Sequence, residues 1–112
     1  MATLTKYGLT ISQLKIILKT AAYPYKGSTK LGHALSKHAG RPNGQQIWGK
    51  LQGASNTWHQ HAMKPLREII RETGYFQLIT DPKTGISWIE KRLPDGRGLR
   101  LNLNYTFKGF ID

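Results

Sequence analysis

Two histidines and two permanently charged basic residues fall within nine positions of the segment Gly32-His33-Ala34-Leu35-Ser36-Lys37-His38-Ala39-Gly40-Arg41. Imidazole exchanges protons near neutral pH, whereas lysine and arginine keep their positive charge. This combination suits proton transfer beside a phosphate group. A surface helix that carries two ordinary polar histidines is the alternative interpretation of the same residues.

A short helix that begins near Leu31 would position these side chains. Residues four apart share a helix face, so His33 would neighbour Lys37, and Lys37 would neighbour Arg41. His33 and His38 are five apart, which separates them by about 140° around a regular helix. We therefore expect one histidine to join a row of cations and the other to lie nearer the core.

The chain has 112 residues, which favours a single domain, 1–112, with one modest core. Its formal net charge is +11, from 17 lysines and arginines against 6 aspartates and glutamates. A folded domain with this charge most often binds nucleic acid. A membrane surface is the main alternative partner, reached by insertion of a helix over residues 11–22. Because no apolar run is as long as a membrane span, we expect no stable membrane association.

The two parts of the chain differ in their hydrophobic pattern. Residues 1–74 are mainly helical in pattern, with a capping box at Thr10 and Gln13 and a kink or a break expected at Pro65. Residues 75–112 alternate between apolar and polar positions and contain turn sequences. The pattern predicts an α+β domain, with N-terminal helices packed on a twisted antiparallel sheet of about four strands. The expected strands cover residues 75–80, 86–93, 97–104 and 105–111.

The third expected strand alternates strictly. Leu99, Leu101 and Leu103 fall on one face, and Arg100, Asn102 and Asn104 fall on the other. Phe107 and Phe110 are expected to point inward from the last strand. If the helix with the histidines crosses this sheet, an imidazole meets a polar floor. A solvated outer face is the alternative for the polar residues.

Several kinds of chemistry are poorly supplied. Neither His33 and His38 nor His59 and His61 have the spacing of a helical zinc pair, and the chain has no cysteine, so we expect no metal and no cofactor. A nuclease that binds a metal through histidine stays an alternative. Metal-independent RNA cleavage fits better, because the ribose 2′-hydroxyl attacks its own phosphate and the protein supplies only acid, base and positive charge.

The run Lys37-His38-Ala39-Gly40 resembles the nuclease domain of colicin D-type tRNases. The wider pattern is similar to the C-terminal toxin domains of contact-dependent inhibition systems and other polymorphic bacterial toxins. The other part of the chain that matches this pattern consists of residues 92–98 followed by 106–110. This resemblance implies the barnase/EndoU/colicin/RelE fold and a metal-independent ribonuclease, commonly directed at tRNA and neutralised by a cognate immunity protein. It also implies export within a larger toxin and action in the cytoplasm of the target cell.

The resemblance carries His38 over as the catalytic histidine, Lys37 as its cationic neighbour, and Thr106 and Lys108 as part of the C-terminal active-site segment. Local chemistry adds His33 to the catalytic group. The residues expected to contact RNA or phosphate are Arg41, Lys91, Arg92, Arg100, Tyr105 and Lys108. An acidic immunity protein is the expected partner, because opposite potentials speed docking. A nucleic-acid-binding module without catalysis is the alternative function.

Overall fold

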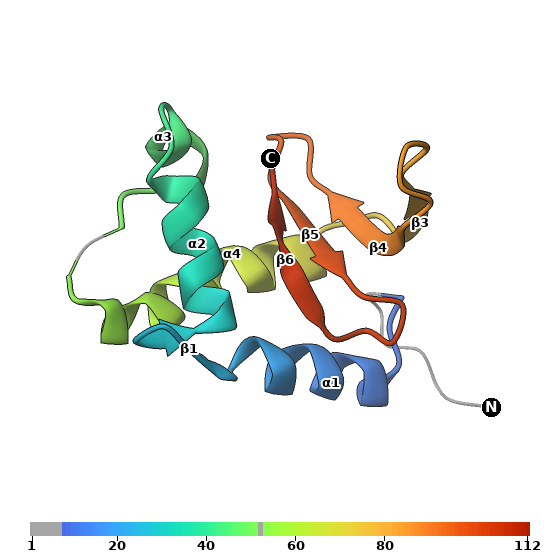
Figure 1. Cartoon of the computed structure of the whole chain (residues 1–112), viewed down its shortest axis with the longest axis horizontal. Coiled ribbons are helices and arrows are strands. Elements are labelled where there is room, and N and C mark those ends of the chain that lie inside the picture. The colour runs from blue at the N-terminus through green and yellow to red at the C-terminus, as the bar shows by residue number, and fades with distance from the viewer. Residues whose placement is uncertain (1–7, 52) are drawn as a thin grey trace.

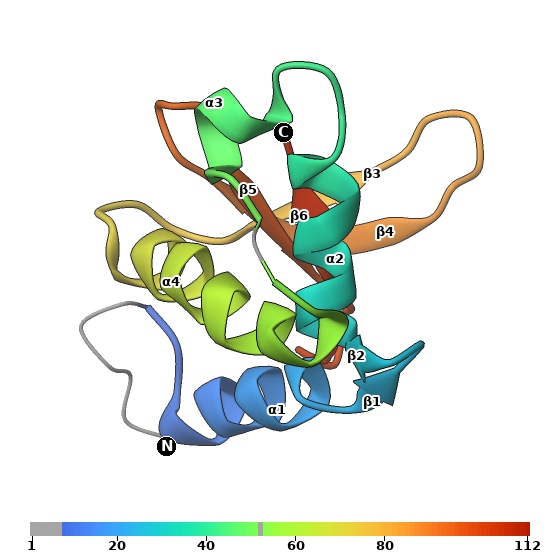
Figure 2. The same cartoon turned by 90° about the vertical axis from the view of Figure 1, so that its left-hand side faces the viewer.

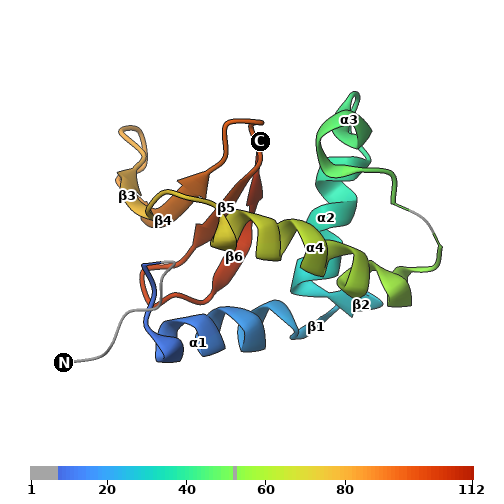
Figure 3. The ribbon, with the colours of Figure 1, turned by 180° about the vertical axis from the view of Figure 1, so that it is seen from behind.

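The computed structural model describes residues 8–51 and 53–112 and has α+β architecture (Figure 1). Helices α1, α2 and α4 pack on the sheet, and Figure 3, the view from behind, shows α4 crossing in front of it. The helices are α1 (Ile11–Ala21), α2 (Lys30–Ala39), α3 (Gly44–Trp48), the 3₁₀-helix η1 (Ser55–Thr57) and α4 (Trp58–Arg71). The strands are β1 (Pro24–Tyr25), β2 (Ser28–Thr29), β3 (Gln77–Thr80), β4 (Ser87–Arg92), β5 (Gly98–Leu101) and β6 (Phe107–Ile111).

Helix α1 begins at the predicted capping box. The Thr10 hydroxyl accepts a hydrogen bond from the Gln13 backbone N–H at 3.0 Å, and the Gln13 side chain accepts one from the Thr10 N–H at 2.9 Å. These two bonds satisfy backbone donors that the first turn leaves unpaired. The buried residues of α1 are Ile17, Thr20 and Ala21, which fall on one side of the helix.

Helices α2 and α4 approach each other closely at Gly32. A Cβ at Gly32 would lie 2.9 Å from the backbone nitrogen of His59, so only glycine fits at this contact. Thr29 caps α2 by accepting the Gly32 N–H at 3.0 Å. Of the kink or break predicted at Pro65, the break does not occur, because Pro65 lies inside one continuous helix. Its missing N–H removes one hydrogen bond of the helix.

The main sheet has the order β3-β4-β5-β6, and every neighbouring pair is antiparallel. Its buried face carries Leu99 and Leu101 from β5 with Phe107 and Phe110 from β6. The prediction that Leu103 continues the apolar face of Leu99 and Leu101 in a strand over residues 97–104 is wrong, because Leu103 is 57% exposed. Strand β5 ends at Leu101, and the chain then turns, so the alternation that predicted burial does not continue.

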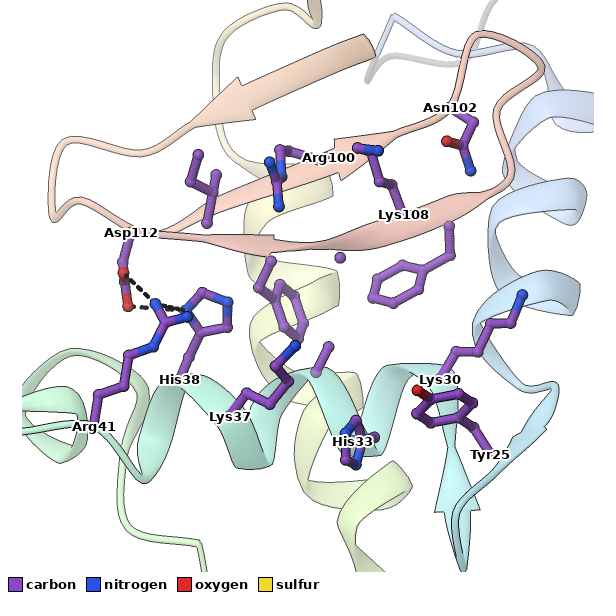
Figure 4. Close-up of a pocket in the computed structure, with 15 residues that line it drawn as sticks. Tyr25, Lys30, His33, Lys37, His38, Arg41, Arg100, Asn102, Lys108 and Asp112 are labelled. Atoms are coloured by element: carbon purple, nitrogen blue, oxygen red, sulfur yellow. Dashed lines mark hydrogen bonds and ion pairs between the residues drawn. The ribbon is translucent and has the colours of Figure 1, made fainter. Parts of the chain in front are cut away.

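A β-bulge explains how Phe107 and Phe110 both reach the core although they are three residues apart. Arg100 pairs with Gly109, whereas Leu101 pairs with Phe107, so Lys108 is the extra residue in β6. A bulge bends the strand and redirects a side chain. Lys108 is exposed as a result, and its side chain extends from β6 toward Arg100 of β5, where it lines a cleft (Figure 4).

The main core is formed where the helices meet the sheet. Its fully buried large side chains include Ile17 from α1, Leu31 from α2, Leu66 and Ile69 from α4, and Phe110 from β6. Figure 2 shows α2 standing against β6, with the small β1–β2 hairpin beside the N-terminal end of α2. Within residues 8–51 and 53–112, no helix is long and apolar enough to cross a membrane.

Candidate active site

A cleft of about 560 Å³ lies between α2 and the sheet edge formed by β6 (Figure 4). One wall comes from the first half of the chain and the other from its last residues. Both predicted histidines, His33 and His38, line it. Five cationic side chains and one carboxylate, that of Asp112, also line it. The cations are Lys30, Lys37, Arg41, Arg100 and Lys108.

His38 is held in a nearly buried position at one end of the cleft, with 8% of its surface exposed. Its ring lies 5.3 Å from the ring of Trp48 and 6.5 Å from that of Phe110, measured between centroids. Its Nδ1 atom lies 3.0 Å from Oδ2 of Asp112. Among the described residues, the other ring nitrogen, Nε2, has no hydrogen-bonding partner, and it faces the cleft in Figure 4.

The carboxylate of Asp112 is itself held from three sides. The Trp48 indole N–H donates to Oδ2 at 2.7 Å, and a terminal nitrogen of Arg41 lies 3.5 Å from Oδ1. Burial acts to raise the pKa of Asp112. The hydrogen bonds from Trp48 and His38, together with the charges of His38 and Arg41, outweigh burial, and the net pKa is lower than usual. Asp112 is therefore ionised at neutral pH.

This arrangement assigns the protons on His38. An ionised carboxylate only accepts hydrogen bonds, so the 3.0 Å contact requires a proton on Nδ1. Neutral His38 then carries its lone pair on Nε2, the nitrogen that faces the cleft. Arg41 also lies 3.3 Å from Nδ1, but an Nδ1–H group cannot accept from it. Arg41 therefore pairs with the carboxylate of Asp112.

The remaining cleft residues present positive charge from both walls. Lys37 and His33 lie on the α2 wall, and the ring of His33 meets the ring of Tyr25 edge-on at 4.9 Å. Arg100 comes from β5, where its guanidinium lies 5.6 Å from the Trp88 ring. Its Nε atom is buried and has no hydrogen-bonding partner among residues 8–51 and 53–112. Lys108 is supplied by the bulge in β6.

Four residues in the predicted site lie outside this cleft. Thr106 holds a turn, since its hydroxyl donates to the Asn104 side chain at 2.7 Å and accepts from the Asn102 amide at 2.9 Å. Arg92 pairs with Glu90 at 2.9 Å. Tyr105 lines a separate apolar depression beside Leu9 and Leu103. The fourth residue is Lys91.

Lys91 requires a correction, because it is only 2% exposed. Its ammonium donates to the carbonyl oxygens of Ile70 at 3.0 Å and Glu72 at 2.6 Å, at the end of α4. Burial lowers the pKa of Lys91, and the charge of Glu72 opposes this shift. The predicted phosphate contact does not fit this position. Strand β4 turns Lys91 toward the core instead of toward solvent.

The sequence reasoning missed Asp112 and Trp48, which hold His38. Neither stands at a regular spacing from His38, because the two lie on other elements of the fold. The only local signal was that Asp112 belongs to a chain with just six acidic residues. Tyr25 and Lys30, which line the far end of the cleft, were also outside the predicted site.

Metal binding finds little support in the donor set of the cleft. The cleft offers a single carboxylate, that of Asp112, and its other permanently charged side chains are cations. In the part of the chain that the structure describes, no three histidine, cysteine, aspartate or glutamate side chains cluster in a way that could hold a metal ion.

Comparisons with known proteins agree with this picture. Residues 18–112 match the family model of the CdiA C-terminal tRNase toxin domain. The chain is also similar to a crystal structure of the toxic C-terminal tip of CdiA from Pseudomonas aeruginosa, solved in complex with an immune protein. The two are 57% identical with a TM-score of 0.78, over 84% of this chain and 99% of that one. No curated protein matches the chain.

Proposed function

The chain belongs to the family of CdiA C-terminal tRNase toxin domains, and we propose that its cleft cleaves tRNA by metal-independent transphosphorylation around His38. Membership of this family makes the protein an antibacterial toxin and an endoribonuclease that acts on tRNA. The observation that carries the proposed mechanism is the position of His38. Its Nδ1 is bound to Asp112 and its Nε2 faces a cleft lined by five cations.

In the proposed reaction, the ribose 2′-oxygen forms a bond to the adjacent phosphorus while the bond from phosphorus to the 5′-oxygen breaks. Nε2 of His38 takes the proton from the 2′-hydroxyl. His33 in its protonated form gives a proton to the departing 5′-oxygen. The products are a 2′,3′-cyclic phosphate and a 5′-hydroxyl end.

The positions of the two histidines fit these roles. His33 and His38 are five residues apart on α2, about 7.5 Å along the axis of a regular helix. A phosphate between them meets Lys37 from the same wall and Arg100 and Lys108 from the opposite wall. Fixed positive groups stabilise the charge that develops on the phosphate oxygens. Arg41 contributes further charge at the Asp112 end.

The partner and the route of delivery follow from the same family. The similar CdiA tip is bound to an immune protein. We infer that this chain is likewise neutralised by a cognate immunity protein, whose acidic surface is attracted to the net charge of +11. The chain would reach the target-cell cytoplasm as the C-terminal part of a larger CdiA protein.

The proposal is tested by His38→Ala and His38→Gln. The glutamine variant is included because its larger polar side chain keeps more of the packing with Trp48. Purified protein is incubated with total tRNA in excess EDTA, and circular dichroism confirms that each variant is folded. We expect wild type to give discrete fragments with 2′,3′-cyclic phosphate ends. Both variants should be slower by about 100-fold or more, the contribution typical of general acid–base catalysis.

His61→Ala is the matched control, because His61 is exposed and lines a different depression from His38. It should cleave like wild type. Full activity of a folded His38 variant would remove the assignment. Loss of wild-type cleavage in EDTA would favour a metal nuclease, and binding of tRNA without cleavage would favour a non-catalytic module.

A further inference from the structure

A small hairpin with two exposed tyrosines stands at the end of the cleft farthest from His38. Strands β1 and β2 pair in the register Pro24 to Thr29 and Tyr25 to Ser28. Tyr23 is 45% exposed and Tyr25 is 40% exposed. Both rings therefore keep a large part of their surface open to solvent. We call Tyr23 and Tyr25, with Lys26 and Lys30, the tyrosine platform.

The platform is fixed to the rest of the fold. Lys30 donates its N–H to the Tyr23 carbonyl at 2.9 Å, which joins the hairpin to the start of α2. Thr29 accepts the Gly32 N–H, and its hydroxyl lies 2.7 Å from Nδ1 of His59 on α4. The rings are therefore held on a base that is tied to two helices.

The turn of the hairpin places a cation above a ring. Lys26 has φ +46° and Gly27 has φ +79°, the combination of signs found in type I′ turns. Asparagine and glycine are the usual residues at such a position, and lysine there carries a conformational cost. The Lys26 ammonium lies 5.3 Å from the Tyr25 ring centre, and that of Lys30 lies 5.5 Å from the Tyr23 ring centre.

The platform is continuous with the proposed catalytic cleft. Tyr25 and Lys30 line the same cleft as His38, and His33 meets the Tyr25 ring edge-on (Figure 4). Tyr25 and Lys30 lie toward the N-terminal end of α2, and His38 lies near its C-terminal end. An RNA strand along the cationic row would bring a nucleotide beside the cleaved phosphate up to Tyr25.

We propose that the tyrosine platform binds an unpaired nucleobase of the RNA substrate by stacking it on Tyr25, with Lys26 and Lys30 beside the adjoining phosphates. Exposed tyrosines with neighbouring cations are the chemistry that binds single-stranded nucleic acid. A base that is stacked within a duplex cannot offer its face to Tyr25. The inference rests on the proposed function, and it adds that the cleaved bond lies next to an unpaired nucleotide.

Binding without cleavage tests the platform separately from catalysis. The probe is a short 2′-O-methyl oligoribonucleotide that contains 2-aminopurine, a fluorescent base that is quenched by stacking. It lacks the 2′-hydroxyl and is not cleaved by the proposed route. Its Kd is measured by fluorescence anisotropy for the single strand and for the same strand in a duplex, with wild type, Tyr25→Ala and Tyr25→Phe.

We expect Tyr25→Ala to raise the Kd for the single strand by about fivefold or more and to abolish the quenching, as for loss of one stacked base. Tyr25→Phe should retain both signals, and duplex binding should be weaker and insensitive to Tyr25→Ala. Tyr75→Ala is the control, because Tyr75 is 80% exposed and lines a different depression.

The two proposals fail in different ways. Unchanged binding and quenching in Tyr25→Ala, together with an inactive His38→Ala, would overturn the platform and leave the catalytic assignment in place. An active His38→Ala together with lost stacking in Tyr25→Ala would do the reverse. A Tyr25→Ala effect on duplex equal to that on single strand would also overturn the requirement for an unpaired base.

Discussion

Nδ1 of His38 lies 3.0 Å from Oδ2 of Asp112, although 74 positions separate the two residues in the sequence. The contact forms because the end of α2 packs beside the end of β6. Trp48 donates to the same carboxylate oxygen at 2.7 Å, so the oxygen is shared between an imidazole and an indole. The pair fixes the orientation of His38 and the nitrogen that it presents to the cleft.

The first prediction is that Asp112→Asn slows tRNA cleavage by about tenfold or more, because an amide no longer enforces the Nδ1–H form of His38. The amide can donate to Nδ1, which would place the proton on Nε2, the atom proposed as the base. The measurement is the pH profile of kcat and of kcat/KM. A structural role alone would lower stability without changing the profile.

Asp95→Asn is the control for this change, since Asp95 is an exposed acidic residue in a turn and pairs with Arg97. It removes the same charge from the chain and should leave the profile unchanged. Equal effects of the two variants would show that net charge, and not the contact with His38, accounts for the loss.

The second prediction concerns the pH dependence of folding. The pKa of Asp112 in the folded protein lies below its ordinary value of 3.8. A carboxyl with a lowered pKa contributes stability above its ordinary pKa, and that contribution is lost as the pH falls through the folded pKa. The free energy of unfolding, measured with urea, should therefore fall less between pH 6 and pH 3 for Asp112→Asn than for wild type. Equal losses would contradict the assigned shift.

The third prediction is that Arg100→Gln and Lys108→Gln weaken RNA binding and make it less dependent on salt. If each contacts one phosphate, each substitution lowers the slope of log K against log salt by about 0.7 for a single strand. The measurement is a salt titration with the uncleavable oligonucleotide. Lys83→Gln is the control, because Lys83 is exposed in the turn between β3 and β4 and does not line the cleft. An unchanged slope in both variants would remove these two contacts.

The fourth prediction follows from the buried position of Lys91. Lys91→Met keeps most of the side-chain volume but removes the donor to the Ile70 and Glu72 carbonyls. Leaving buried acceptors unpaired should lower the free energy of unfolding by about 1–3 kcal/mol. Cleavage per folded molecule should not change, because Lys91 is buried and does not line the cleft. Reduced cleavage at full stability would restore the role in RNA binding that its buried position argues against.

Local rules were enough to predict much of the fold. The capping box at Thr10 and Gln13 depends on neighbouring residues, and the alternation of Leu99 and Leu101 depends on one strand. The turns that join β3 to β4 and β4 to β5 contain proline, glycine and aspartate, whose backbone preferences are local. These features therefore appear in the sequence before any long-range contact is known.

The site was only partly predictable, for physical reasons. His38 and Lys37 lie on one helix, so their relation follows from helical spacing. Asp112 and Trp48 reach His38 through packing of separate elements, for which the chain contains no periodic signal. Lys91 stands between the charged residues Glu90 and Arg92 in β4, but its ammonium donates to the carbonyls at the end of α4. This partner lies about twenty residues away, and local polarity could not reveal it.

The fifth prediction tests whether α3 must pack closely on α2 for the site to form. A Cβ at Gly44 would overlap the carbonyl oxygen of His38 and lie 3.1 Å from its carbonyl carbon. Helix α3 carries Trp48, whose indole holds Asp112, so Gly44→Ala should move α3 away and loosen that hydrogen bond. Overpacking of this kind typically costs about 1–3 kcal/mol of stability. The free energy of unfolding in urea and the rate of tRNA cleavage should both fall in Gly44→Ala. Gln45→Ala, at the next and exposed position, should change neither. A stable, fully active Gly44→Ala would show that the contact of Trp48 with Asp112 does not depend on this close approach.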